Sequence, residues 1–445
     1  MGLIFFLFYT ALFSVLILKW RFFGINGIHR GFILAAFYLK LAAGFGLSYL
    51  YSTHYEDRGT GDTFRFYDDA RVMHRCLEEQ GPGPYLKLLS GIGFWEDRDA
   101  LPYYMEMTHL ERPHHKGYVN DNATMIRANA LVLHLSRGHY HVHTVFWCFA
   151  AMIGLTALLR LLLSYFPRKR VAMYFSVFLL PTTLFWGSGV LKEPILLMGM
   201  GLLLLGFFRF IFGEPSRYKW LHMALGLLFM ILAKGYILFL MLPALSGLLL
   251  VKLFRGRRFW LWFSLPHAAA VLFFLLGPQI GGKADLAHEF AWKQKAFYNE
   301  AVLSEAGSLI EIPPVNRAVD VFLNAPNALM NTYLRPWITE GRNLLYLPAA
   351  LENLFLMICI AVMAWNFRRP YGLAIPIIAF GISFVLTLGI AIGGMVPVLG
   401  ALVRYKMPAL IFLFAVTFAL TDHIMLQRRL PFIRKLVKKL WRKPY

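Results

Sequence analysis

The stretch KEPILLMGMGLLLLGFFRFIF occupies residues 192–212 and decides the fold class. These 21 residues form an almost unbroken apolar run, long enough as an α-helix to cross a hydrocarbon core of about 30 Å. Comparable blocks recur along the chain, and we place them at 2–18, 31–51, 144–165, 171–187, 221–233, 236–254, 259–277, 346–366, 371–390 and 406–422. The sequence therefore predicts an all-α polytopic membrane protein with about 11 transmembrane helices.

The composition of the whole chain agrees with this class. Of the 445 residues, 58% are hydrophobic and 16% are charged, whereas soluble domains carry about 25% charged residues. This balance excludes a disordered chain, a coiled coil and a solvated single domain, and we treat 1–445 as one transmembrane domain. The three cysteines define no disulfide framework.

The net charge of +21 has a definite location in the sequence. Of the 45 basic residues, 23 lie in six short clusters beside the apolar blocks, which hold only two acids. The clusters are 19–30, 166–171, 209–220, 252–258, 368–369 and 422–445. The rest of the chain is neutral, so the surplus indicates a positive-inside topology and not a nucleic-acid partner. The tail at 423–445 is then cytoplasmic and favours anionic lipid.

Two long apolar segments decide the number of crossings. Residues 221–254 would span about 51 Å as one helix, so we expect two short crossings with a hinge at Ala233-Lys234-Gly235. We expect residues 371–404 to make one crossing, followed by an outer re-entrant or interfacial piece that contains Gly393, Gly394 and Pro397.

Two large loops lie on the opposite side from the basic clusters. The first extracytoplasmic loop, 52–143, holds 13 of the 24 acids and nine of the 14 histidines, and the second is 278–345. Residues 63–79 and 286–305 have helical patterns, so both loops are expected to be ordered and to bear short helices.

The first candidate site opens with Gly61-Asp-Thr-Phe-Arg-Phe-Tyr-Asp-Asp69. On a helix, Asp62, Arg65 and Asp69 would share one face. A carboxylate at the outer membrane edge can act as a general base toward a hydroxyl. Asp62 could instead serve as the helix N-cap, while Asp68 and Asp69 could be solvated or paired with nearby arginines.

The second candidate site is the tight outer turn Phe185-Trp-Gly-Ser-Gly-Val-Leu-Lys-Glu-Pro194. Lys192 could hold a phosphate, and Glu193 could orient an acceptor or help to hold a cation. The structural alternative is a Lys192–Glu193 pair that caps the next helix, with Pro194 in its first turn.

Several isolated cations in apolar surroundings do not follow the positive-inside pattern. They share the outer side of the predicted topology and suggest an anionic headgroup; they are Lys234, Arg335, Arg342, Arg404 and Lys406. Lys40 lies in the middle of the second span, where it could contact the same phosphate or pair internally.

The metal candidates are weak. His139-x-His141-x-His143 would place three rings on one face of a strand, and His114-His115 adds two more, but no acid or cysteine motif completes a site. We predict no metal site.

These motifs together resemble the GT-C superfamily of membrane glycosyltransferases, in particular bacterial members that use polyprenyl-phosphate-linked sugars. The likeness rests on Gly61-Asp62-Thr63, Ser188-Gly-Val-Leu-Lys-Glu193, the segment from Leu334-Arg-Pro-Trp337 through Leu351-Glu-Asn353, and Arg404-Tyr-Lys-Met-Pro408. Two features differ from the family: an extra span precedes the usual first one, and Asp68-Asp69 replaces the familiar Asp-Glu pair.

The resemblance implies a GT-C-like fold and sugar transfer from a polyprenyl-phosphate donor to a glycan, lipid or protein hydroxyl. The reaction would take place at the periplasmic face of the bacterial inner membrane. Asp62 would be the general base, with Asp68, Asp69 and Glu193 as further catalytic candidates. The lipid phosphate would bind Lys192, Lys234, Arg335, Arg342, Arg404 and Lys406. Family members differ in metal dependence, so a divalent cation is neither required nor indicated.

Two other functions fit parts of the sequence. An O-antigen-type polysaccharide polymerase would also need a large outer loop and a lipid-phosphate leaving group. A lipid-linked glycan transporter or flippase would suit broken helices at 233–235 and 391–399.

Overall fold

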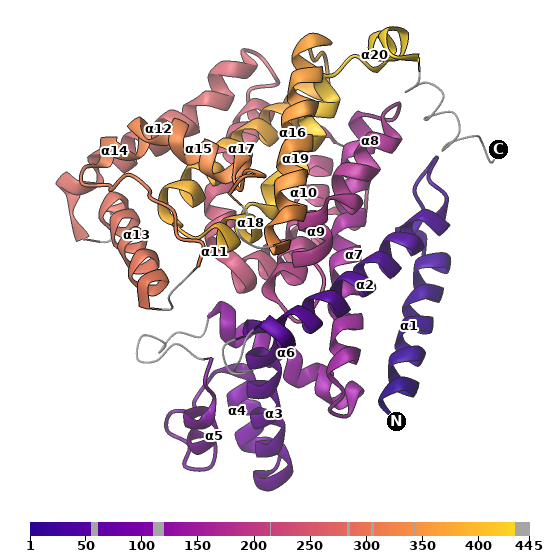
Figure 1. Ribbon diagram of the computed structural model, residues 1–445, viewed down its shortest axis with the longest axis vertical. Coiled ribbons are helices and arrows are strands. Elements are labelled where there is room, and N and C mark those ends of the chain that lie inside the picture. The colour runs from indigo at the N-terminus through magenta and orange to yellow at the C-terminus, as the bar shows by residue number, and fades with distance from the viewer. Residues whose placement is uncertain are drawn as a thin grey trace. The chain divides into compact units, whose positions relative to one another are not determined.

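The computed structural model describes residues 1–54, 61–109, 120–213, 215–282, 285–303, 307–340 and 344–431. These residues contain helices and turns but no strand, as Figure 1 shows in chain order. The chain divides into two compact units, Met1–Leu161 with Thr183–Phe239 and Leu162–Thr182 with Leu240–Tyr445. Helices α7, α9 and α11 each continue from one unit into the other.

The first unit contains two kinds of helix. Helices α3 to α6 pack on one another at the bottom of Figure 1, whereas α1, α2, α7, α10 and α11 are long and apolar. The bounds are α1 Gly2–Lys19, η1 Arg21–Phe23, α2 Arg30–His54, α3 Asp62–Gln80, α4 Pro82–Ser90, α5 Leu101–Glu106, α6 Asp121–Ser136, α7 Tyr140–Tyr165, α9 Pro181–Trp186, α10 Lys192–Phe212 and α11 Lys219–Leu253.

The second unit is built around α17, which packs against α13, α15 and α19. Its bounds are α8 Arg170–Tyr174, η3 Phe175–Leu179, α12 Phe259–Ile280, α13 Leu286–Leu303, α14 Ala318–Leu323, α15 Ala325–Leu334, η5 Leu344–Tyr346, α16 Leu347–Trp365, α17 Ala374–Met395, α18 Leu399–Tyr405, α19 Met407–Leu420 and α20 His423–Arg429.

Eight of the described helices are long and apolar enough to cross a membrane, and the bent pair α18–α19 would make a ninth. The chain is therefore a multi-pass membrane protein by the length and composition of its helices. Seven expected spans correspond to single helices; they are α1, α2, α7, α10, α12, α16 and α17. The expected helices at 63–79 and 286–305 are confirmed as α3 and α13.

The expected count of about 11 spans is too high. Residues 171–187 do not form one span, because the chain there is divided among α8, η3 and α9. The hinge expected at Ala233-Lys234-Gly235 is confirmed, because α11 comprises two helical segments joined at a kink at Lys234 (φ −152°, ψ 76°). By length and composition, the whole of α11 counts as one candidate span. Gly393 and Gly394 belong to α17, and the break after α17 comes at Val396 and Pro397.

Close packing of the apolar helices depends on glycine. A Cβ atom at Gly154 of α7 would lie 2.0 Å from the Leu197 carbonyl oxygen of α10, and one at Gly201 would lie 2.0 Å from the Gly154 oxygen. In the second unit, a Cβ at Gly393 would lie 1.9 Å from the Ala328 oxygen. Small residues allow this backbone contact, which supplies van der Waals packing where lipid offers no hydrophobic driving force.

The basic clusters expected on the inner side come together within each unit. In the first, the Arg160 guanidinium donates to the carbonyls of Arg21, Phe22 and Gly24 at 2.6–2.8 Å. In the second, Lys169 donates to three carbonyls at the end of α19 and its connection to α20, also at 2.6–2.8 Å. This grouping is what a positive-inside arrangement requires.

We expect the first loop and the α20 end to lie on opposite sides of the membrane. The exposed positions Glu96 and Arg428 allow a test, because the three native cysteines are all buried and the parent chain provides the unlabelled control. An impermeant maleimide should label Glu96→Cys in intact cells and Arg428→Cys only after permeabilisation. Labelling of both variants from one side would contradict the topology.

Candidate functional site

One face of α3 forms the first part of the candidate site. Asp62, Arg65 and Asp69 share this face, as the sequence predicted, and all three contact the segment Met107–His109. Arg65 donates to the Thr108 carbonyl at 2.8 Å, and Asp69 accepts the backbone N–H groups of Thr108 and His109 at 2.9 and 2.8 Å. The backbone of Thr108 and His109 is therefore fixed against α3.

Asp62 lies at the start of this face, beside a histidine. Gly61 is the N-cap of α3 and Asp62 is its first helical residue, so the alternative of Asp62 as N-cap is wrong. The Asp62 Oδ1 atom lies 3.3 Å from His109 Nε2, with about a third of the Asp62 side chain exposed and His109 mostly buried. His109 Nε2 makes no hydrogen bond within the described part of the chain.

The other two aspartates of α3 have different surroundings. Asp69 is buried, and this burial raises the pKa of its carboxyl group against the opposing effect of the two backbone hydrogen bonds. Asp68 lines a separate hollow between α3 and α6 with arginines and histidines. The structure thus places Asp69 as a support for His109, and Asp68 away from Asp62.

The turn at 188–193 meets the first loop. Lys192 Nζ lies 2.7 Å from Asp121 Oδ2 at the start of α6 and 5.7 Å from the centre of the Phe66 ring. The same ring packs against His109, with their centres 4.6 Å apart. Phe66 therefore links the Asp62–His109 contact to the Lys192–Asp121 pair, and the two predicted motifs of this unit form one site.

Glu193 and Lys234 form a second pair in the first unit. Lys234 Nζ lies 2.8 Å from Glu193 Oε1, and both side chains are buried. Lys234 stands at the backbone break of α11, and Pro194 is in the first turn of α10, as expected. The expected Lys192–Glu193 capping pair is not formed, because each residue has a partner distant in the sequence.

Lys40 pairs internally. Its buried ammonium group donates to the Thr183 carbonyl at 3.0 Å and to the Ser188 hydroxyl at 3.1 Å. These contacts hold the start of the 188–193 turn against α2, which gives Lys40 a structural role in the site.

The cations of the second unit also have polar partners. Arg335 forms an ion pair with Glu340, and Lys406 donates to Asn353 Oδ1 at 2.8 Å and to the Arg335 carbonyl at 3.2 Å. Arg404 is half-buried in the last turn of α18, and Arg342 lies outside the described residues. The expectation of isolated cations is therefore wrong for Lys234, Arg335 and Lys406, because each has a polar partner.

The histidines near residue 140 do not face one another. His141 and His143 lie on helix α7 and His139 directly precedes it, so their spacing separates the rings. His143 is buried and bonded to Ser136 and Asn129, while His139 and His141 contact phenylalanines. Within the described residues, no three His, Cys, Asp or Glu side chains are grouped to hold a metal ion; His114 and His115 lie outside them.

Sequence reasoning missed three members of the site: His109, Asp121 and Phe66. Asp121 follows Asn120, whose side chain caps α6. An Asn followed by an acidic residue is typical of a helix N-terminus, so the sequence did contain a signal for the start of α6. His109 and Phe66 carried no local signal, because their roles come from contacts between distant segments.

Comparison of the chain with models of protein families, with curated proteins and with solved structures found no match.

We expect Asp69→Ala to loosen the segment at 107–109. The change leaves two backbone N–H groups without their acceptor, a loss of about 1–3 kcal/mol in the free energy of local opening. Amide hydrogen exchange of a peptide covering 107–109 should become faster. Asp68→Ala, one position away, should leave that exchange unchanged, and equal acceleration by both variants would contradict the assignment.

We expect the Glu193–Lys234 pair to behave as a unit in thermal unfolding of the detergent-solubilised protein. Glu193→Gln or Lys234→Gln alone leaves a buried charge uncompensated, which costs about 3–5 kcal/mol, and the double variant should recover most of the lost melting temperature. Arg317, whose side chain is 73% exposed in its ion pair with Asp320, is the control position, since Arg317→Gln should cost at most about 1 kcal/mol. Additive losses at Glu193 and Lys234 would show that the two are not coupled.

Proposed function

We propose that the chain is a membrane glycosyltransferase with Asp62 as its general base. It would transfer a sugar from a polyprenyl-phosphate-linked donor to an acceptor hydroxyl on the extracytoplasmic side. The observation that carries the proposal is the position of Asp62: partly exposed, beside His109, and linked through Phe66 to the cation Lys192.

The chemistry assigns each group a task. Asp62 removes the proton of the acceptor hydroxyl, whose oxygen forms the new bond to the anomeric carbon. The bond from that carbon to the phosphate oxygen of the donor breaks, and the lipid phosphate leaves as an anion. Lys192 compensates the charge that develops on the phosphate, and preorganised charge of this kind is often the largest catalytic effect.

His109 supports this assignment. Its Nε2 atom is close to Asp62 but lacks a hydrogen bond within the described residues, and an unsatisfied polar atom in a mostly buried ring favours an incoming polar ligand. A hydroxyl bound beside Asp62 would supply the hydrogen bond that His109 Nε2 lacks among the described residues and would place its proton next to the carboxylate.

The partners of the other candidates limit their roles. Asp121 neutralises Lys192 in the free protein, so the phosphate must compete with a carboxylate that is itself half exposed. Glu193 pairs with Lys234 and thus supports the turn more directly than it could orient an acceptor. Arg335, Arg342, Arg404 and Lys406 stay candidates for donor binding through the family resemblance alone.

One observation favours a lipid-linked glycan transporter as the second candidate. A buried ion pair stands at the Lys234 break of α11, and discontinuous helices with polar groups are typical of transporter sites.

The proposal is tested by Asp62→Asn in proteoliposomes supplied with a panel of polyprenyl-phosphate monosaccharides. Asn preserves size and cannot accept the proton, so transfer should fall about 10²–10⁴-fold while binding of the donor persists. Because Asp62 is not the N-cap, the helix should remain intact, and the melting temperature should show little change.

Asp68→Asn is the matched control, with the same substitution on the same helix in the separate hollow, and it should retain transfer. Wild-type rates for Asp62→Asn would disprove the assignment of the base. Movement of a lipid-linked glycan across the bilayer without sugar transfer would favour the transporter.

A further inference from the structure

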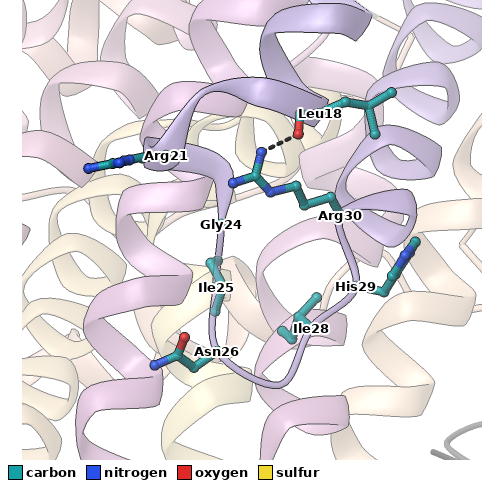
Figure 2. A pocket seen from close by; sticks show the side chains of 8 residues that line it. All are labelled: Leu18, Arg21, Gly24, Ile25, Asn26, Ile28, His29 and Arg30. Carbon is teal, nitrogen blue, oxygen red and sulfur yellow. Dashed lines mark hydrogen bonds between the residues drawn. The ribbon is translucent and has the colours of Figure 1, made fainter. Parts of the chain in front are cut away.

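A hollow of about 620 Å³ lies at the connection between α1 and α2. Figure 2 shows the chain forming a ring around it, with Arg30 across the upper edge, and Ile25, Asn26 and Ile28 along the lower part. Leu18, Arg21 and His29 complete the lining. The site is distant in the chain from every residue assigned to sugar transfer and does not depend on that proposal.

The ring is fixed by hydrogen bonds. Arg30 donates to the Leu18 carbonyl, and Arg160 from α7 holds the carbonyls of Arg21, Phe22 and Gly24. The Gly31 N–H donates to His29 Nδ1 at 3.1 Å. A ligand in the hollow would therefore meet a preformed backbone and lose little affinity to ordering it.

The charge around the hollow is positive. Among the described residues, no carboxylate forms an ion pair with Arg21 or Arg30. Arg30 and Arg209 both lie close enough to Arg160 to interact with it electrostatically. This differs from the cations Lys192, Lys234 and Arg335, each of which pairs with an acid. Neighbouring guanidinium groups repel one another, so an anion bound here would relieve that repulsion.

The surroundings of the hollow are apolar and exposed. Leu18, Trp20 and Phe32 are each more than 40% exposed, and α1 and α2 present further large apolar side chains outward along their lengths. Tryptophan is typical of the membrane–water interface. The hollow thus lies where a lipid phosphate would sit, with apolar helix surfaces available to its acyl chains.

We propose that this hollow binds the phosphate group of an anionic phospholipid in the leaflet on the side of the basic clusters. Arg30 provides a half-buried guanidinium at the edge of the ring, and Arg21 adds an exposed positive charge. Glycerol and phosphate oxygens face the polar lining residues Arg21, Asn26 and Arg30, and the acyl chains lie along α1 and α2.

The test is native mass spectrometry of the full-length protein in a neutral detergent, titrated with phosphatidylglycerol or phosphatidylcholine. Phosphatidylglycerol should bind more tightly. Arg21→Gln should raise the apparent Kd for phosphatidylglycerol about fivefold, because one basic residue near a lipid phosphate contributes about 1 kcal/mol. Arg30→Gln should raise it at least as much. The Arg21 side chain makes no hydrogen bond or ion pair within the described residues, so Arg21→Gln should fold even if Arg30→Gln loosens the turn.

Arg257→Gln is the control, because it removes the same charge from another exposed basic turn, and it should leave the affinity unchanged. Equal weakening by Arg257→Gln, or equal binding of phosphatidylcholine, would overturn the proposal. Displacement of the lipid by millimolar inorganic phosphate would identify a free anion as the ligand and would also overturn it.

Discussion

The compensation of charge inside apolar helices is the constraint on which this structure depends. A lysine removed from water needs a polar partner, and Lys40, Lys234 and Lys406 each find one within their own unit. Two of them stand where a helix is interrupted: Lys234 at the break in α11, and Lys406 at the 62° bend between α18 and α19. Both interruptions are buried within the protein, which is where a membrane protein tolerates irregular backbone.

The candidate site follows from the same constraint. Lys40 holds the 183–188 region, which leads directly to Lys192 and Glu193. Helix α3 in turn holds the backbone of Thr108 and His109 through the buried carboxylate of Asp69. Asp62, two turns earlier on the same face, keeps about a third of its side chain exposed. Burial thus distinguishes two carboxylates of one helix face: Asp69 holds backbone N–H groups, and Asp62 is the one that we propose as the general base.

The cations of the chain fall into two groups with different electrostatics. Those near the proposed reaction are balanced by acids, as in the Lys192–Asp121 pair. A phosphate that binds Lys192 must therefore replace the interaction of the lysine with the carboxylate, which reduces the net gain in binding free energy. Those at the α1–α2 connection, Arg21 and Arg30, lack such acids among the described residues, and Arg30 instead donates to a backbone carbonyl. We therefore expect the α1–α2 connection to attract anionic lipid at all times. We expect Lys192 to attract the proposed substrate only when the phosphate displaces Asp121.

The sequence by itself determined the class of fold and most element positions. Apolar runs such as 192–212 predicted single helices closely, because their length and composition are fixed by the bilayer, and the spacing of Asp62, Arg65 and Asp69 predicted their shared face. It predicted more spans than the eight or nine candidates found among the described residues, because hydropathy does not show that residues 171–187 are divided among α8, η3 and α9. The kink at Lys234 was predicted correctly. Only the tertiary structure decided which charges pair: Lys192 with Asp121, Glu193 with Lys234, and Asp62 with His109. These partners lie 41 to 71 positions apart in the first unit, and pairing at that separation depends on how helices pack, which no local pattern of residues encodes.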